Sequence, residues 1–346
     1  MRFVAKRDAS FMEAVAKLKK HKLYPGPVLI ILATSSTVWA TQEAAEQFKG
    51  AKMKIESLNF LEVVRHFESL PVAEIVRIYG AIGGVPAYLD KWDAAKSFKD
   101  NICRLVLTPS GALYGEADAV ISSELRELSA YSTILAAIAR GENKLNDIFH
   151  ATGFSRAKIS VYLKNLATFN IVEKVVSFET GGWENAKKGV YQIKDTFVNF
   201  WFKFVYPNMS NLYLLSPEEF YDTYIEKELD AYLERYFREV CTEYLLILNQ
   251  MGQLPFTIKR VGTWIGKTGR IDIVAQSEDR RSIIGFCNWD KPMMTMDMCE
   301  NMAMAMEQAR LTSDDYYLFS ATDFEPALQS YVVRDPRFKL INMNEL

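Results

Sequence analysis

The pattern of apolar and polar positions in the first 58 residues predicts helices that alternate with two strands. Apolar residues recur at helical spacing between residues 8 and 21, and a continuous apolar run at 28–33 predicts a buried strand. After another helix, residues 51–58 alternate like a second strand. Two strands cannot cover the faces of a parallel sheet, so we expect the end of an α/β domain, with uncovered edges that favour association.

Helical spacing continues through residues 59–122, which we expect to form a helical subdomain. Amphipathic helices are predicted at 60–67, 73–82 and 96–106. The sequence Gly83-Gly84-Val85-Pro86 follows the second helix and predicts a tight turn before a short helix.

Residues 123–206 have the outline of a winged helix-turn-helix. Three short helices are predicted at 131–140, 145–152 and 155–168, and two strands at 171–178 and 189–193. The third would be the recognition helix, capped by Ser155, with Ile159, Leu163 and Leu166 facing the core. The residues expected to contact double-stranded DNA are Arg156, Lys158, Ser160, Lys164, Lys187 and Lys188. Winged helices also serve as rigid spacers or protein-binding modules, and this alternative stays open.

The remaining segment, 207–346, predicts a mixed α/β domain. A long helix is expected at 217–251 and another at 296–310. The expected strands lie at 256–261, 269–276, 282–288, 316–320 and 338–341. The run from Gly262 to Thr268 has three residues between its glycines, whereas a phosphate-binding loop needs four, so we interpret it as a hairpin turn.

Composition narrows the class of protein. The chain has 346 residues, and at roughly 150 residues per domain this suggests two domains or three small ones. Its 41 Lys and Arg against 43 Asp and Glu give a formal charge of -2, so any DNA contact must be local. Its four cysteines and three histidines are scattered, so no His/Cys metal site is expected. A charged N-terminus and short apolar runs predict a cytoplasmic protein that does not contact a membrane.

Asp272 is the clearest candidate for chemistry. It lies midway along an expected strand, and polar positions follow on the next strand, which is the layout of a magnesium-dependent phosphodiesterase site. Such a site needs two carboxylates to hold the ion and a lysine to polarise the water or the phosphate. Here the second carboxylate position holds Phe286 and the lysine position holds Asn288.

Six stretches of the chain resemble the archaeal-type P-loop ATPases, which are AAA-like, STAND-related proteins. The stretches are Leu-Asn-Phe at 58–60, Tyr-Gly-Ala-Ile-Gly-Gly-Val-Pro-Ala-Tyr-Leu at 79–89, Leu-Tyr-Gly-Glu at 113–116, Tyr-Ser-Thr-Ile-Leu at 131–135, Tyr-Gln-Ile-Lys-Asp at 191–195 and Phe-Trp-Phe at 200–202. The resemblance implies an α/β multidomain protein. Its parts would be a remnant of the ATPase α/β core at 1–58, a helical lid at 59–122, the winged helix at 123–206 and a restriction-endonuclease-like α/β domain at 207–346.

The same resemblance implies ATP and Mg²⁺ as cofactors of the family. Thr34, Ser35 and Ser36 resemble its polar sensor, and Gly83 and Gly84 resemble its lid motif. In that family the phosphate loop and the Walker B acid precede the segment similar to residues 1–22, so we expect this chain to begin after them. These residues would bind ATP only if a second copy or a partner completed the core, and no cofactor is expected for the chain alone.

The family's endonuclease-like domain typically carries Phe-Glu, Ile-Asp and Glu-Cys-Lys. The matching positions here read Phe237-Arg238, Ile271-Asp272 and Phe286-Cys287-Asn288, and Glu239 is the nearest other acid. The leading hypothesis is a DNA- or protein-binding module without autonomous ATP hydrolysis. The alternatives are a divergent magnesium-dependent nuclease using Asp272 with Glu239, and a truncated or mis-started form of a full ATPase.

Overall fold

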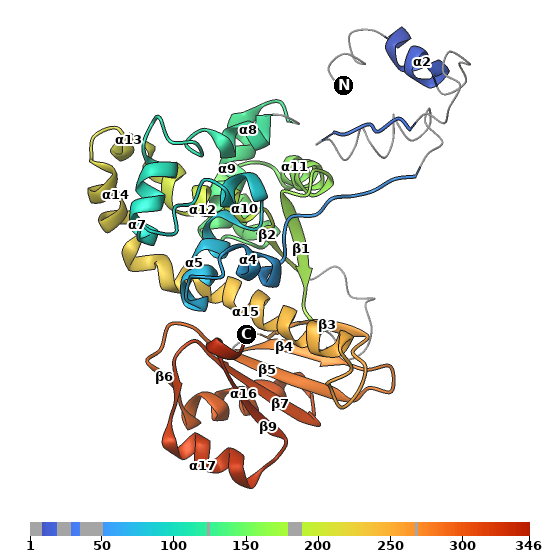
Figure 1. Ribbon diagram of the computed structural model, residues 1–346, viewed down its shortest axis with the longest axis vertical. Helices are drawn as coiled ribbons and strands as arrows, with labels where there is room; N and C mark the ends of the chain where they lie inside the picture. The colour runs from blue at the N-terminus through green and yellow to red at the C-terminus, as the bar shows by residue number, and fades with distance from the viewer. Residues whose placement is uncertain (1–8, 19–28, 35–50, 123–124, 179–188, 267–268) are drawn as a thin grey trace.

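The computed structural model describes residues 9–18, 29–34, 51–122, 125–178, 189–266 and 269–346 (Figure 1). It has a mixed α/β fold in which a body of helices lies on one side of a long helix and a mixed sheet lies on the other (Figure 1). Within the described ranges no helix is both long enough and apolar enough to cross a membrane.

The N-terminal region forms one helix, α2 (Ala9–Leu18), and no strand in its described part. The two strands predicted at 28–33 and 51–58 are therefore wrong for the residues that can be seen, 29–33 and 51–58. Leu29, Ile31, Met53 and Ile55 are between 78% and 89% exposed, so at least one face of each segment is uncovered. A strand needs a neighbour for its N–H and C=O groups, and apolar alternation by itself does not supply one.

The helical body starts at α4, and its first turn is held by carboxylates and an amide. Asn59 and Glu62 form a capping box, and Glu243 accepts hydrogen bonds from the N–H groups of Phe60 (3.0 Å) and Leu61 (3.1 Å). The following elements are α4 (Phe60–His66), α5 (Val72–Ile82), α6 (Pro86–Leu89), α7 (Phe98–Ile102) with a π-helical continuation (Cys103–Leu107), and α8 (Glu116–Ser122). The helices predicted at 60–67, 73–82 and 96–106 are thus confirmed within a few residues.

The helices and strands predicted between residues 131 and 193 are also found within a few residues, and we refer to this set of elements as the winged-helix unit. It consists of α9 (Leu128–Ala139), α10 (Leu145–Thr152), α11 (Arg156–Thr168), β1 (Val172–Val176) and β2 (Gly189–Ile193). β1 and β2 pair antiparallel, and Ser155 caps α11 by accepting from the N–H of Lys158 at 3.3 Å. The chain then enters the shared core through α12 (Thr196–Phe200) and a π-helical continuation (Trp201–Val205).

The single helix predicted at 217–251 is divided in two. After α13 (Met209–Leu212), the helices are α14 (Pro217–Tyr224) and α15 (Glu226–Gln250). Ile225 lies between the two helices and is distorted within the right-handed helical region, with φ −109° and ψ −55°. The new first turn carries Glu226 and Glu228, whose negative charges suit a helix N-terminus, so α15 begins as an independent helix.

The C-terminal sheet has the strand order β3-β4-β5-β7-β9. β3–β4 and β4–β5 are antiparallel, whereas β5–β7 and β7–β9 are parallel. The strands are β3 (Arg260–Ile265), β4 (Arg270–Gln276), β5 (Ser282–Asn288), β7 (Asp315–Ser320) and β9 (Phe338–Asn342), with a short pair β6 (Met293–Met294) and β8 (Asp323–Phe324). Its helices are α16 (Met296–Ala309) and α17 (Pro326–Arg334).

Buried residues of the sheet alternate between two cores. Ile273 and Ala275 pack in the core that contains α15, and Val274 and Ile284 pack in the core that contains α16. The strand predicted at 256–261 is found later, at 260–265, and α17 was not predicted. The run from Gly262 to Ile265 is part of β3 and not of a turn, although the β3–β4 hairpin itself is confirmed.

Candidate nucleic-acid interface

The exposed face of α11 carries the predicted DNA-contacting residues that the structure describes. Arg156, Lys158, Ser160 and Lys164 are all exposed. The opposite face is buried, and it consists of Ile159, Tyr162, Leu163 and Leu166. The 3.6-residue period therefore separates a polar face from an apolar face as the sequence predicts.

The charges of α11 are all of one sign. Its 13 residues include three cations and no carboxylate, in a protein whose formal charge is -2. Arg156 and Lys158 lie in the first turn, where the helix dipole favours a negative charge. This arrangement costs helix stability, and an anion bound at the first turn offsets that cost.

Aromatic rings hold two of these cations over the helix surface. The Arg156 guanidinium lies 4.1 Å from the Phe149 ring centroid, and its Nε donates to Asn146 Oδ1 at 2.9 Å. The Lys158 ammonium lies 4.3 Å from the centroid of Phe154. These contacts reduce the side-chain freedom lost when a phosphate binds.

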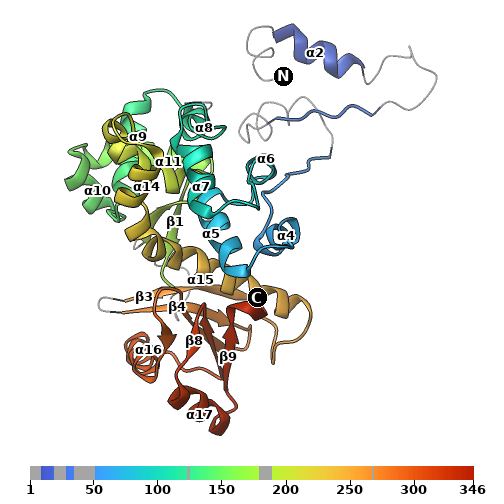
Figure 2. The same cartoon turned by 60° about the vertical axis from the view of Figure 1, so that its left-hand side comes forward.

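The stem of the β1–β2 hairpin is fixed against the C-terminal sheet. The Phe178 N–H donates to the carbonyl of Thr263 at 2.8 Å, and Ser177 Oγ accepts from the Ile265 N–H at 2.8 Å. Figure 2 shows β1 running from the helices of the winged-helix unit to the sheet. Lys187 and Lys188, the predicted contacts of the wing, lie outside the described residues.

Asp272, the candidate nuclease residue, is bound by two guanidinium groups. Its Oδ1 lies 3.0 Å from Arg238 Nε and 2.9 Å from Arg270 Nε, and its Oδ2 accepts from the Cys287 N–H at 3.1 Å. The Asp272 side chain is 5% exposed. Arg238 stands where the resemblance would place a glutamate, so a fixed positive charge lies next to the carboxylate that a metal would need.

Glu239 and Asn288, the other residues predicted for the nuclease-like site, each have partners of their own. Glu239 forms an ion pair with Arg235 at 2.8 Å and remains half exposed. Asn288 is buried, and its Nδ2 donates to the carbonyl of Lys291 at 3.2 Å and to Ser320 Oγ at 3.1 Å. No group of three or more His, Cys, Asp or Glu side chains placed to hold a metal occurs in the described part of the chain.

Gly83 and Gly84, which resemble residues of the family's lid motif, have structural explanations. Gly84 lies so close to the 51–58 segment that a Cβ there would be 1.8 Å from the Leu58 carbonyl oxygen, and its own carbonyl accepts from the Leu58 N–H at 2.8 Å. Gly83 has φ +69°, which favours glycine. Thr34 is exposed, and Ser35 and Ser36 lie outside the described residues.

Sequence reasoning missed two features near these sites. Arg238 of α15 pairs with Asp272 of β4, which lies 34 positions away in the sequence, and Arg270 of β4 pairs with the same carboxylate. The structure also has a cavity beside Arg77. The sequence does not predict it, because its walls come from four separate elements, namely α5, α14, α15 and the start of α7.

Comparison with known proteins identifies relatives of part of the chain. Residues 201–304 match DUF234, a family described as archaea bacterial proteins of unknown function. An uncharacterized protein of Methanocaldococcus jannaschii is 30% identical over 276 residues, which are 79% of this chain and 61% of that protein. The chain thus spans about 61% of the length of that relative. No solved structure matches. The segment from the end of α12 into α16 is therefore similar to DUF234.

Proposed function

We propose that this protein binds nucleic acid, most simply duplex DNA, through the exposed face of α11. The observation that carries the proposal is that all the charged side chains of this helix are positive. It has three cations and no acid, in a protein of net charge -2. Binding to phosphate is local, since the chain as a whole offers no positive field.

The shape of α11 suits the major groove of DNA. Its 13 residues form a rod of about 20 Å, and a major groove of about 12 Å in width admits a helix. Ala157 and Val161 lie between the cations on the exposed face, and Val161 is 57% exposed. Small apolar side chains there allow a close approach to the bases and contact with thymine methyl groups.

Lys158 and Lys164 are the residues assigned to phosphate contact. They lie six positions apart on the exposed face, so they reach separate points along the backbone. Ser160 lies between them and supplies a hydroxyl, although it donates to the Arg156 carbonyl at 2.9 Å in the free protein. Arg156 is held by Asn146 and Phe149 and borders the same face.

The nuclease hypothesis has no comparable support. The Asp272 carboxylate forms ion pairs with two arginines, and the Glu239 carboxylate forms an ion pair with Arg235. A carboxylate neutralised by guanidinium groups has less capacity to bind a divalent cation. We therefore assign the C-terminal sheet no catalytic step.

The proposal is tested by fluorescence anisotropy with a labelled DNA duplex. The Lys158→Gln/Lys164→Gln double variant is expected to bind about tenfold or more weakly than wild type, because two phosphate contacts are lost. Lys91→Gln is the matched control, since Lys91 is exposed but lies outside the winged-helix unit. Equal affinity of wild type and double variant, or an equal loss in the control, contradicts the proposal.

A further inference from the structure

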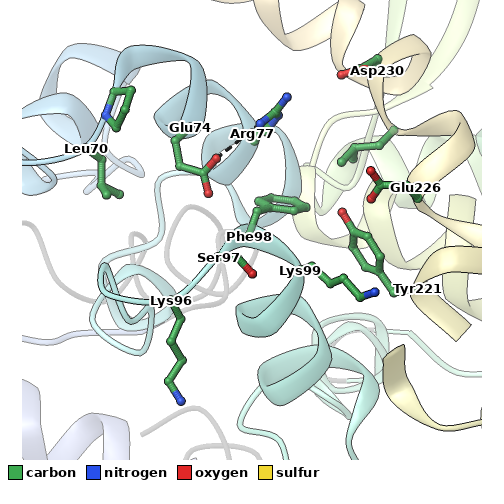
Figure 3. A pocket seen from close by; sticks show the side chains of 12 residues that line it. Leu70, Glu74, Arg77, Lys96, Ser97, Phe98, Lys99, Tyr221, Glu226 and Asp230 are labelled. Atoms are coloured by element: carbon green, nitrogen blue, oxygen red, sulfur yellow. Dashed lines mark ion pairs between the residues drawn. The ribbon is translucent and has the colours of Figure 1, made fainter. Parts of the chain in front are cut away.

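A cavity of about 480 Å³ lies between α5, the start of α7 and the α14–α15 junction (Figure 3). Its size is within the range of small-molecule sites. No residue of α11 lines it, so it is a different site from the candidate nucleic-acid interface.

Arg77, on α5, has hydrogen-bonding capacity that the protein does not use. Its Nε is buried without an acceptor among the described residues, whereas the Arg77 side chain as a whole is 41% exposed and borders the cavity. The carboxylate closest to it, Glu74 Oε2, lies 3.6 Å from Nη1, which is longer than a hydrogen bond. A ligand carboxylate matches the planar fork of a guanidinium.

Two of the other charged groups of the cavity have partners within the protein. Lys99 donates to Asp222 at 2.6 Å, and Asp230 accepts from the Trp289 indole at 3.1 Å. Glu226 faces the same space as Arg77 and Tyr221 (Figure 3). Burial and the charge of the nearby Glu226 raise the pKa of Tyr221, so the phenol stays protonated beside that carboxylate. Glu226 keeps further lone pairs for a ligand cation.

The charge and apolar walls restrict the class of ligand. The lining contains three cations, Arg77, Lys96 and Lys99, and three acids, Glu74, Glu226 and Asp230. A balanced lining disfavours a polyanion such as a nucleotide and suits a molecule with no net charge. Leu70, Phe98 and Leu229 supply apolar wall for the body of the ligand.

We propose that this cavity binds a small zwitterion with an apolar side chain, of the α-amino-acid class. The ligand carboxylate binds Arg77, its ammonium group binds Glu226, and its side chain packs against Phe98. Neither charged end alone satisfies the site, since each charged protein group needs its own counterpart.

Isothermal titration of the wild-type protein with three related probes tests the class of ligand. L-phenylalanine carries both charges, whereas 3-phenylpropionate lacks the ammonium group and 2-phenylethylamine lacks the carboxylate. L-phenylalanine is expected to bind about tenfold or more tightly than either, the effect of one charge-assisted hydrogen bond. Absence of saturable L-phenylalanine binding, or equal binding of the three probes, overturns the proposal.

Variants then locate the site. Arg77→Gln and Glu226→Gln are each expected to weaken L-phenylalanine binding by about tenfold, and Arg77→Lys by less, because a cation remains. Lys91→Gln again serves as the exposed control. Circular dichroism confirms that each variant is folded. Full affinity in both folded glutamine variants overturns the assignment, whatever the outcome of the DNA experiment.

Discussion

The carboxylate of Asp272 stabilises the fold through its two arginines. Arg238 has a side chain that is 15% exposed, whereas Arg270 is 44% exposed. Loss of the Asp272 charge leaves Arg238 as an uncompensated, largely buried cation, and removal of one partner from a buried pair typically costs about 3–5 kcal/mol.

Asp272→Asn is therefore expected to lower the free energy of unfolding by about 3 kcal/mol. Arg270→Gln, which removes the more exposed partner, should cost about 1 kcal/mol or less. Urea denaturation of the two variants and wild type measures both values. Similar losses in the two variants would show that Arg238 does not depend on this carboxylate.

Asp195 should make the free energy of unfolding depend on pH. Its carboxylate accepts from the Val198 N–H at 2.9 Å at the start of α12, and burial, with a further contribution from Glu116, raises the pKa of Asp195 above 3.8. The unfolded chain therefore releases this proton first as pH rises, so this residue lowers stability through the window above pH 3.8.

Asp195→Asn should remove this pH dependence and keep the helix cap, since asparagine caps as well as aspartate. The variant is expected to gain stability relative to wild type as pH increases from about 4 to 7. Thermal unfolding across that range checks the trend. A difference that stays constant or shrinks with increasing pH would contradict the assignment.

At this scale the sequence predicted which residues face solvent on α11, because helical period alone determines that division. It did not predict the surroundings of Asp272. Arg238 is 34 residues away in sequence and reaches the carboxylate only because α15 packs on the sheet. The role of a buried charged residue depends on partners that are distant in the sequence. The local pattern of apolar and polar residues does not identify those partners.

Among the elements, α4 depends on a side chain from another helix. Glu243 of α15 accepts from the N–H groups of Phe60 and Leu61, in addition to the local cap from Asn59. A carboxylate at this position satisfies otherwise unpaired donors and interacts with the positive end of the helix dipole.

Glu243→Ala is expected to lower stability by about 1–2 kcal/mol, the usual cost of losing a cap that accepts hydrogen bonds. The amides of Phe60 and Leu61 should exchange with solvent faster, whereas amides in the middle of α11 should not change. Hydrogen exchange followed by NMR reports both sets. Unchanged exchange at residues 60 and 61 would contradict the capping role.

Element prediction succeeded where a local signal and a nearby partner coincide. The hairpin of β1 and β2 follows three helices within one short segment, so each element finds its neighbour nearby. The strands predicted at 28–33 and 51–58 failed where they can be seen, because no described strand pairs with them. The division between α14 and α15 at Ile225 was also not predicted, since the helical spacing of apolar residues continues through it.

At the scale of the whole molecule, the winged-helix unit and the C-terminal sheet are joined. Phe178 pairs with Thr263 on the edge strand β3, and one hydrophobic core extends from α5 through α15 to the sheet. The sequence predicted the order of these parts along the chain. It did not predict which of them are in contact. The exposed Leu29, Ile31, Met53 and Ile55 are consistent with self-association, which stays a prediction.

The proposed binding of DNA through α11 depends on a local positive surface of a protein that is slightly acidic as a whole. The most direct test is the salt dependence of DNA affinity, for wild type and the Lys158→Gln/Lys164→Gln variant, measured by anisotropy over a series of NaCl concentrations. Wild-type affinity should fall steeply with salt, and the variant should have a log–log slope shallower by about 2. A wild-type affinity that is independent of salt, or identical slopes for the two proteins, would contradict nucleic-acid binding by this helix.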